Sequence, residues 1–140
     1  MDQVFLKQNE GWNAEPNAPY PKVEVKGSSL ELEFLANPYR FKEYSDGEKI
    51  VLTFDNCLRY RLGSTNDEGW YRGQCRFSKL APEWGEFYEI KGATWDDKLS
   101  DWIDVGKNVG QQPRHFLFYF RDETFECKAS NWSMQRIKGN

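Results

Sequence analysis

The residues best suited to chemistry lie in the segment from Asn56 to Phe77, where two short runs alternate between apolar and arginine-rich positions. The arginine-rich positions, which include one tryptophan, are Arg59, Arg61, Trp70, Arg72 and Arg76. Successive side chains of a strand point to opposite faces, so each run is expected to carry its arginines on one face. Guanidinium groups bind carboxylates and phosphates through paired hydrogen bonds and stack on aromatic rings. The pattern therefore predicts a surface that recognises an anionic or aromatic partner.

If the two runs are neighbouring strands, the register that places Tyr60 opposite Tyr71 gathers those side chains on one face. A slip by one residue would put arginines on the apolar face, which is costly. The next predicted strand has Glu86 on its polar side and brings it close to the second run. We therefore predict a binding surface made of Arg59, Arg61, Trp70, Arg72, Arg76, Trp84, Glu86 and Tyr88. The alternative is that the arginines pair with carboxylates on the adjacent strand, such as Glu86 with Arg72 or Arg76, and serve the fold alone.

Catalytic chemistry finds less support in the sequence. Glu83 and Glu89 would lie about 20 Å apart in one strand, with Glu86 on its other side, so no two of them fit the paired carboxylates of a glycosidase. His115 is the only histidine, and its predicted strand turns it away from Cys127. This arrangement excludes a Cys–His nucleophilic pair within that hairpin. A hydrolase that uses His115 or carboxylates is therefore the third hypothesis.

The three cysteines, Cys57, Cys75 and Cys127, are widely spaced and form no C-x-x-C pair. A structural zinc site needs four ligands at close spacing, and this requirement is not met. A calcium loop that begins at Asp101 fails at its third, fifth and twelfth ligand positions. We expect no metal and no cofactor, and we interpret the cysteines as buried thiols in a reducing cytoplasm.

Short segments of alternating apolar and polar residues, separated by turn signals, must position these side chains. The clearest is 29–34, where Leu30, Leu32 and Phe34 alternate with polar residues. The other predicted strands are 4–6, 22–26, 48–54, 57–62, 70–77, 84–90, 115–121 and 124–129, with a loop over 9–21 and a hairpin turn at Asp55–Asn56. The pattern predicts a mainly β protein with about eight to ten antiparallel strands, folded as a sandwich or a closed barrel.

One segment has a different period. Thr94–Ile103 begins with a capping threonine followed by acids, and Trp95, Leu99 and Trp102 recur at helical spacing. Acids in the first turn interact favourably with the helix dipole. We expect one short helix here.

The last predicted hairpin allows a register to be derived. A symmetric turn at Asp122–Glu123, with a loop of four residues favoured, places Phe118 opposite Cys127. The core face is then Phe116, Phe118, Phe120, Phe125, Cys127 and Ala129, and the other face is His115, Tyr119, Arg121, Glu126 and Lys128.

The chain of 140 residues fits one domain, 1–140, and carries 19 Lys and Arg against 22 Asp and Glu, a net charge of −3. This balance argues against nucleic-acid binding, which needs clustered positive charge. No apolar run reaches the roughly 18–20 residues of a membrane helix. The N-terminal residues lack the pattern of a signal peptide, so we expect a cytoplasmic protein without a membrane partner.

Aromatic residues make up 16% of the chain, although the mean hydropathy is a polar −0.84. Large aromatic side chains build cores and are enriched at binding surfaces. We expect a non-catalytic binding domain that engages a protein partner through the arginine-rich face. The second hypothesis is a small-molecule or carbohydrate-binding domain with an aromatic-lined pocket.

Overall fold

The computed structural model describes residues 4–63, 85–92, 102–106, 113–120 and 123–138. Every regular element within these ranges is a β-strand. The strands are β1 (Val4–Lys7), β2 (Lys22–Lys26), β3 (Ser29–Leu35), β4 (Lys49–Asp55), β5 (Arg59–Gly63), β6 (Phe87–Lys91), β7 (Ile103–Asp104), β8 (Arg114–Tyr119), β9 (Thr124–Ala129) and β10 (Asn131–Ile137).

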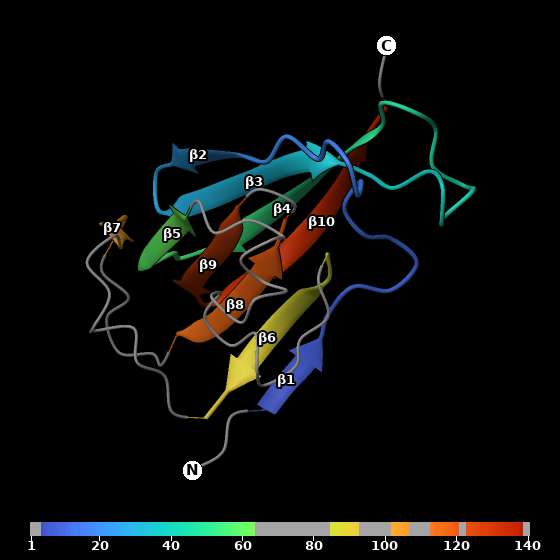
Figure 1. The fold of residues 1–140 in the computed structure, drawn as a ribbon. Helices are drawn as coiled ribbons and strands as arrows, with labels where there is room; N and C mark the ends of the chain where they lie inside the picture. Colours follow the sequence, from blue (N-terminus) through green and yellow to red (C-terminus); the bar gives the residue numbers. More distant parts are fainter. Residues whose placement is uncertain (1–3, 64–84, 93–101, 107–112, 121–122, 139–140) are drawn as a thin grey trace.

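The strands form two antiparallel sheets that pack face to face (Figure 1). The larger sheet has the order β1-β6-β8-β9-β5-β7, and the smaller one has the order β10-β4-β3-β2. The predicted mainly β, antiparallel fold is therefore confirmed. Of the two architectures that the sequence left open, the protein adopts the sandwich and not the closed barrel.

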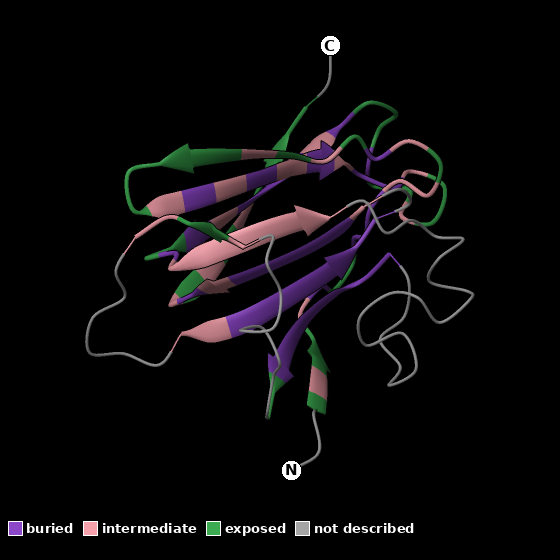
Figure 2. Cartoon of the chain, turned by 60° about the vertical axis from the view of Figure 1, so that its left-hand side comes forward, coloured by how far each residue is buried: buried purple, intermediate pink, exposed green. Residues whose placement is uncertain are grey.

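The core lies between the sheets and follows from period-two alternation. In β3, Leu30, Leu32 and Phe34 are buried, while the residues between them are half-buried on the outer side. Burial is greatest in the central strands and falls in the edge strands β1 and β2, most of whose residues are exposed (Figure 2). Alternation of this kind is typical of a sheet with one face on the core.

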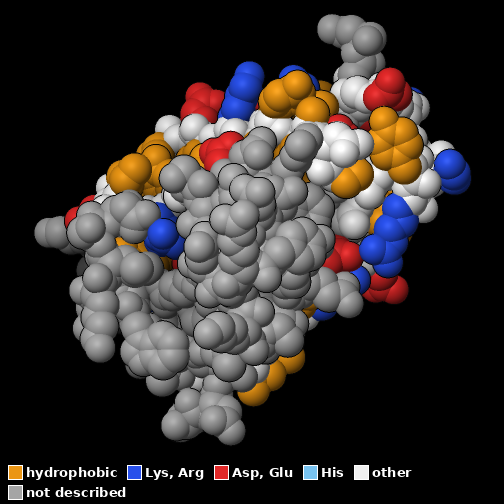
Figure 3. Space-filling view, viewed as in Figure 1, with side chains coloured by type: hydrophobic (Ala, Val, Ile, Leu, Met, Phe, Trp, Pro, Cys, Tyr) orange, Lys and Arg blue, Asp and Glu red, His pale blue; other side chains and the backbone are white. Residues whose placement is uncertain are grey.

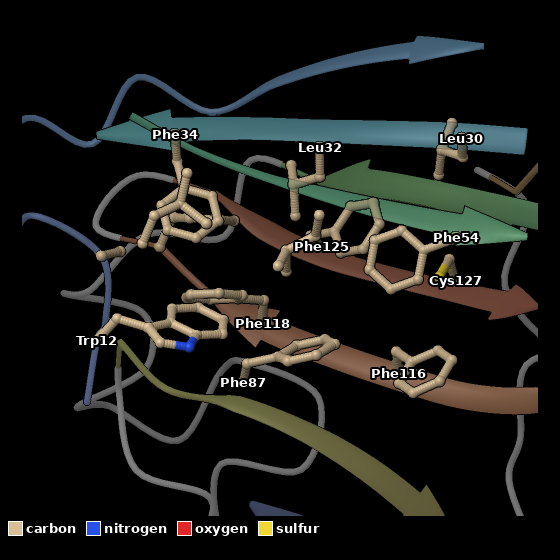
Figure 4. Close-up of a cluster of buried hydrophobic side chains, with 14 of the residues drawn as sticks. Trp12, Leu30, Leu32, Phe34, Phe54, Phe87, Phe116, Phe118, Phe125 and Cys127 are labelled. Carbon is tan, nitrogen blue, oxygen red and sulfur yellow. The ribbon is translucent and has the colours of Figure 1, made fainter. Parts of the chain in front are cut away.

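Phenylalanine dominates the layer that the larger sheet contributes to this core (Figure 4). Phe87 of β6 stacks on both Phe116 and Phe118 of β8, with ring centroids 5.6 and 5.7 Å apart. Trp12 reaches the same cluster from the predicted loop over 9–21, with its ring centroid 6.0 Å from that of Phe34. Few but large side chains thus form the core of a chain whose mean hydropathy is polar.

The β8–β9 hairpin has the predicted sidedness but not the predicted register. Phe118 lies opposite Phe125, and Phe116 lies opposite Cys127, a shift of two residues from the expected pairing. The backbone N–H of Phe120 donates to the carbonyl of Glu123, so the turn is centred one residue earlier than predicted. A two-residue shift keeps every side chain on its face, and sidedness alone therefore does not distinguish the two registers.

The predicted hairpin at Asp55–Asn56 is wrong, because the chain crosses there from one sheet to the other. β4 pairs with β3 and β10, whereas β5 belongs to the larger sheet. Asn56 has a φ of 49°, a conformation that asparagine tolerates well. The N–H of Cys57 then donates to the carbonyl of Ser28 and that of Leu58 to Lys128, so the crossing is bonded to both sheets.

The predicted helix does not extend to its expected end. Ile103 belongs to β7, where it lies opposite Tyr60. Pairing with β5 gives this residue backbone partners in a sheet, which override its local helical spacing. The rest of the predicted helix, 94–101, lies outside the described residues, as does the predicted strand over 70–77.

Candidate functional site

Four of the eight residues of the predicted binding surface lie within the described part of the chain. Three of them, Arg59, Arg61 and Tyr88, share one face of the larger sheet, and Glu86 lies just before β6. This face, termed here the outer face, is turned away from the smaller sheet. One row across it runs from Arg61 through Glu126 and Leu117 to Tyr88, each opposite the next. The four residues are Arg59, Arg61, Glu86 and Tyr88, whereas Trp70, Arg72, Arg76 and Trp84 lie outside the described residues.

Glu126 is the centre of a buried ionic network on the outer face. Its carboxylate is fully buried, with Oε2 2.7 Å from Arg61 Nη1 and Oε1 2.7 Å from His115 Nε2. The Arg61 side chain is 11% exposed and that of His115 is 4% exposed. A buried carboxylate with charge-assisted bonds on both oxygens is held in one geometry. The network therefore orients the imidazole ring of His115.

Trp102 joins the network to Arg59. The Arg59 guanidinium carbon lies 5.0 Å from the centroid of the Trp102 ring. The same ring has its centroid 6.3 Å from that of His115. A guanidinium over an indole face is a favourable cation–π arrangement. An aromatic side chain thus lies between the two basic groups.

The expected direction of the β8 and β9 side chains is confirmed, but His115, Tyr119 and Glu126 are buried as well. Leu117, Tyr119 and Ile90 form a second apolar cluster on the outer face. The middle of this face is therefore not open to solvent. Arg61 follows the structural alternative, since it pairs with a carboxylate on the adjacent strand.

The predicted register with Tyr60 opposite Tyr71 is wrong. Tyr60 lies opposite Cys127 of β9 on one side and opposite Ile103 of β7 on the other. A strand residue has only two neighbours in its sheet, and both places at Tyr60 are taken. The apolar side of the run is nevertheless as predicted, because Tyr60 and Leu62 pack against the main core.

Glu86 is buried, with two basic partners among the described residues. Its Oε1 lies 3.4 Å from Lys7 Nζ and 3.2 Å from Arg40 Nη1. Asn9 Nδ2 donates to its other oxygen, and Asn9 Oδ1 accepts from the N–H of Phe87. Glu86 thus anchors the loop that follows β1 against the start of β6, a structural role.

A hollow lies at the end of the larger sheet where β6 ends and β8 begins. Ile90, His115 and Lys128 reach it from the outer face, and Glu89 and Arg114 reach it from the opposite face. It has a volume of about 450 Å³ and is lined by Glu89, Ile90, Lys91, Gly92, Pro113, Arg114, His115 and Lys128. Four of these side chains are basic or imidazole groups, and only one is a carboxylate. We term it the basic hollow.

The carboxylate in the basic hollow is already neutralised. Arg114 donates to both oxygens of Glu89, over 3.0 Å from Nε and 2.9 Å from Nη2. The hydrogen bonds from Arg114 hold the pKa of Glu89 below its ordinary value and raise the pKa of Arg114. Glu89 is therefore ionised at neutral pH, and its charge is balanced by Arg114. Lys91, which is exposed, has no ion pair with any described residue.

Two thiols lie in contact inside the core. Cys57 and Cys127 are both buried and free. A hydrogen bond from Cys127 lowers the pKa of Cys57, whereas burial raises the pKa of Cys127. Cys127 is on the inner face of β9 and His115 on the outer face of β8. The two therefore do not form a nucleophile–base pair, as the sequence predicted.

Sequence reasoning missed Lys91, Arg114 and Lys128 as members of a site. Lys128 was placed on the outer face, and His115 is its direct neighbour across the strands. Lys91 and Arg114 follow from no local pattern, because the basic hollow forms only where β6, β8 and β9 meet. Among the described residues, no group of three His, Cys, Asp or Glu side chains is arranged to hold a metal ion.

Comparison with protein-family models, with curated protein sequences and with solved structures finds no significant match to this chain. Within the described residues, no helix has the length and apolar character needed to cross a membrane. The functional argument therefore depends on the geometry of the outer face and of the basic hollow.

Proposed function

We propose that this protein is a non-catalytic binding domain that takes an acidic segment of a partner protein into the basic hollow. The observation that carries the proposal is the charge of the lining. Lys91, Arg114 and Lys128 are basic residues of this lining, and the one carboxylate, Glu89, is already neutralised by Arg114. The charge of Lys91 is therefore not balanced by an ion pair within the described residues. A cavity with surplus positive charge favours an anionic occupant and speeds its association.

The buried network supports a role in binding more than one in turnover. His115 is fixed by Glu126, and Glu126 is fixed in turn by Arg61. This network forms a rigid floor for a ligand, which lowers the entropy lost on binding. The described lining contains no serine, threonine or cysteine that His115 would activate as a nucleophile.

A protein segment suits the hollow because the outer face contributes aromatic and basic groups together. Trp102 contacts both Arg59 and His115, beside the lining. Aromatic residues and arginine are enriched in protein–protein interfaces, with lysines at the polar rim. We place the protein in the cytoplasm as part of this proposal. Its support is the sequence, in which three widely spaced cysteines form no paired disulfide framework.

The test is fluorescence anisotropy with a labelled hexaglutamate peptide, titrated with the protein at low ionic strength. We expect saturable binding that weakens as salt rises, since screening reduces the attraction. The double variant Lys91→Glu/Lys128→Glu should weaken binding by about tenfold or more, the cost of replacing attraction with repulsion.

The matched control is Lys42→Glu/Lys138→Glu, which changes the net charge by the same amount at exposed positions outside the basic hollow. This control should bind nearly as the wild type does. Equal loss in both variants would show that net charge alone drives association and would overturn the proposal. Binding of inorganic phosphate without binding of the peptide would overturn the proposal that the occupant is a segment of a protein.

A further inference from the structure

The second notable surface lies on the smaller sheet, at Tyr20. This residue has a φ of 48° and a side chain that is 68% exposed. A bulky residue in the left-handed region is strained, because its Cβ approaches the following carbonyl group. Pro19 and Pro21 flank it and restrict the chain further. Strain of this kind is retained mainly where the surrounding structure imposes it and where it serves a function.

Hydrogen bonds on both sides of Tyr20 impose its left-handed conformation. The N–H of Leu35 donates to the carbonyl of Pro19 over 2.8 Å, and the N–H of Glu15 donates to the carbonyl of Leu35 over 2.9 Å. Lys22 lies opposite Glu33 in the β2–β3 pair. Three residues on the β2 side therefore span only two on β3, as in a β-bulge. The extra residue at this point turns the side chain of Tyr20 outward.

The loop before Tyr20 is also held. The carboxylate of Glu15 accepts hydrogen bonds from the backbone N–H groups of Asn17 and Ala18, over 2.7 and 2.9 Å. Ala14 forms a bridge with Ala36 beyond the end of β3. The phenol ring is thus presented from a backbone that is fixed at both ends. Pre-organised aromatic groups bind with a smaller entropic cost.

Tyr20 borders a hollow of about 400 Å³, lined by Tyr20, Lys22, Glu33, Phe34, Leu35 and Lys49. Glu33 Oε2 lies 3.8 Å from Lys49 Nζ, a loose ion pair whose two side chains are partly exposed. Ligand sites commonly combine apolar and aromatic walls with a few polar groups that fix the ligand's orientation. This hollow has that composition, with an aromatic platform beside one acceptor and two donors.

A second hollow continues from the first over β2 and β3 and shares Lys22 and Glu33 with it. Across the two, the charges balance: the basic residues are Lys22, Lys26 and Lys49, and the acidic residues are Glu24, Glu31 and Glu33. In Figure 3, acidic, basic and apolar side chains alternate along the upper edge, where Figure 1 shows β2. The groove thus offers donors and acceptors in equal number without net charge.

The geometry points to a binding site for a neutral oligosaccharide in this groove, with Tyr20 as its stacking platform. The apolar face of a pyranose ring packs on an aromatic ring. Each sugar hydroxyl both donates and accepts, and alternating lysine and glutamate side chains satisfy both needs with charge-assisted hydrogen bonds. A charged ligand would meet as much repulsion as attraction from this lining. The site is separate from the basic hollow, which lies on the other sheet.

The experiment is a calorimetric titration of the full chain with cellohexaose, maltohexaose and chitohexaose. We expect saturable binding of at least one of these neutral chains, and we expect Tyr20→Ala to weaken it by about tenfold or more, through loss of stacking. The matched control is Tyr39→Ala, which removes an equally accessible tyrosine, 63% exposed, outside both hollows. This control should bind as the wild type does.

A second variant separates binding from folding. Tyr20→Gly removes the platform but suits the left-handed backbone, so we expect this variant to fold and to lose binding nevertheless. The proposal is overturned if none of the three chains binds, if Tyr20→Ala and Tyr20→Gly bind as tightly as the wild type, or if only the acidic hexagalacturonate binds. Lys91→Glu should leave saccharide binding unchanged, since that residue belongs to the basic hollow.

Discussion

Arg61 Nη1 lies 2.7 Å from Glu126 Oε2, and the two residues are directly opposite each other in β5 and β9. Neither charge has free access to water, because the carboxylate is fully buried and the guanidinium nearly so. Buried pairs of this kind add little net stability compared with apolar residues, but either partner is costly to leave alone. The pair therefore fixes how β5 and β9 align more than it stabilises the fold.

Glu126→Gln should lower the free energy of unfolding by about 3 kcal/mol, because it leaves the Arg61 cation buried without its counter-charge. Urea denaturation followed by tryptophan fluorescence measures the change. The double variant Arg61→Met/Glu126→Gln should be more stable than Glu126→Gln alone. Glu24→Gln, at an exposed position of β2, is the control and should change stability by less than about 0.5 kcal/mol. An equally small effect of Glu126→Gln would contradict the buried pair.

Stability should depend on pH through Glu89. Its pKa in the folded protein lies below the ordinary value of 4.5 because Arg114 donates hydrogen bonds to its carboxylate. A carboxyl group with a lowered folded-state pKa stabilises the fold above the unfolded-state pKa. This stabilisation is lost as the pH falls through the folded-state pKa. As the pH is lowered from about 5, the urea concentration at the unfolding midpoint should fall less steeply for Glu89→Gln than for the wild type. Parallel curves would show that this ion pair contributes nothing.

Cys127 should resist thiol reagents in the native protein. It is fully buried, and burial raises its pKa, so the reactive thiolate is scarce at neutral pH. In a Cys75→Ser background, Ellman's reagent should react slowly with the native chain and at once with both remaining thiols in denaturant. Fast labelling of Cys127 while the circular dichroism spectrum stays native would rule out its position on the inner face of β9.

Tyr20→Gly should raise the free energy of unfolding by about 1 kcal/mol, the cost of a left-handed conformation for a residue with a side chain. The ring is largely exposed, so little burial is lost. Tyr39→Gly, at a position whose φ is not positive, should instead be neutral or destabilising. Thermal and urea unfolding of the two variants checks this difference. A less stable Tyr20→Gly would mean that the ring itself supports the fold.

Most strands and their buried faces could be predicted because alternation acts locally, although β10 (Asn131–Ile137) and the short β7 were not among the predicted strands. Leu30, Leu32 and Phe34 alternate with polar residues in the sequence and are buried in β3 as expected. The same rule fixes faces but not register: Phe118 is on the predicted face and yet lies opposite Phe125 instead of Cys127. Two registers that differ by two residues bury the same side chains, so only the turn distinguishes them.

The sites could not be predicted to the same extent, because they are built from residues far apart in the chain. The alternation predicts the face of β5 on which Arg61 lies, but it does not predict its partner Glu126, which comes from β9. Glu86 was expected to meet arginines of the second run, and its described partners are Lys7 and Arg40. Tyr20 was assigned to a loop, and the Pro-Tyr-Pro sequence that restrains it is the one local signal of its exposed, strained position.

The order of the strands has a consequence for how the chain assembles. β2, β3 and β4 are consecutive and pair with one another, so this meander has its partners as soon as it leaves the ribosome. β1 emerges earlier, but its partner within the described residues is β6, where Val4 lies opposite Lys91. Contacts between distant segments form slowly, since a long loop must close first. We therefore expect the nascent chain to build its smaller sheet from the meander outward, and β1 to join the larger sheet only after β6 has been synthesised.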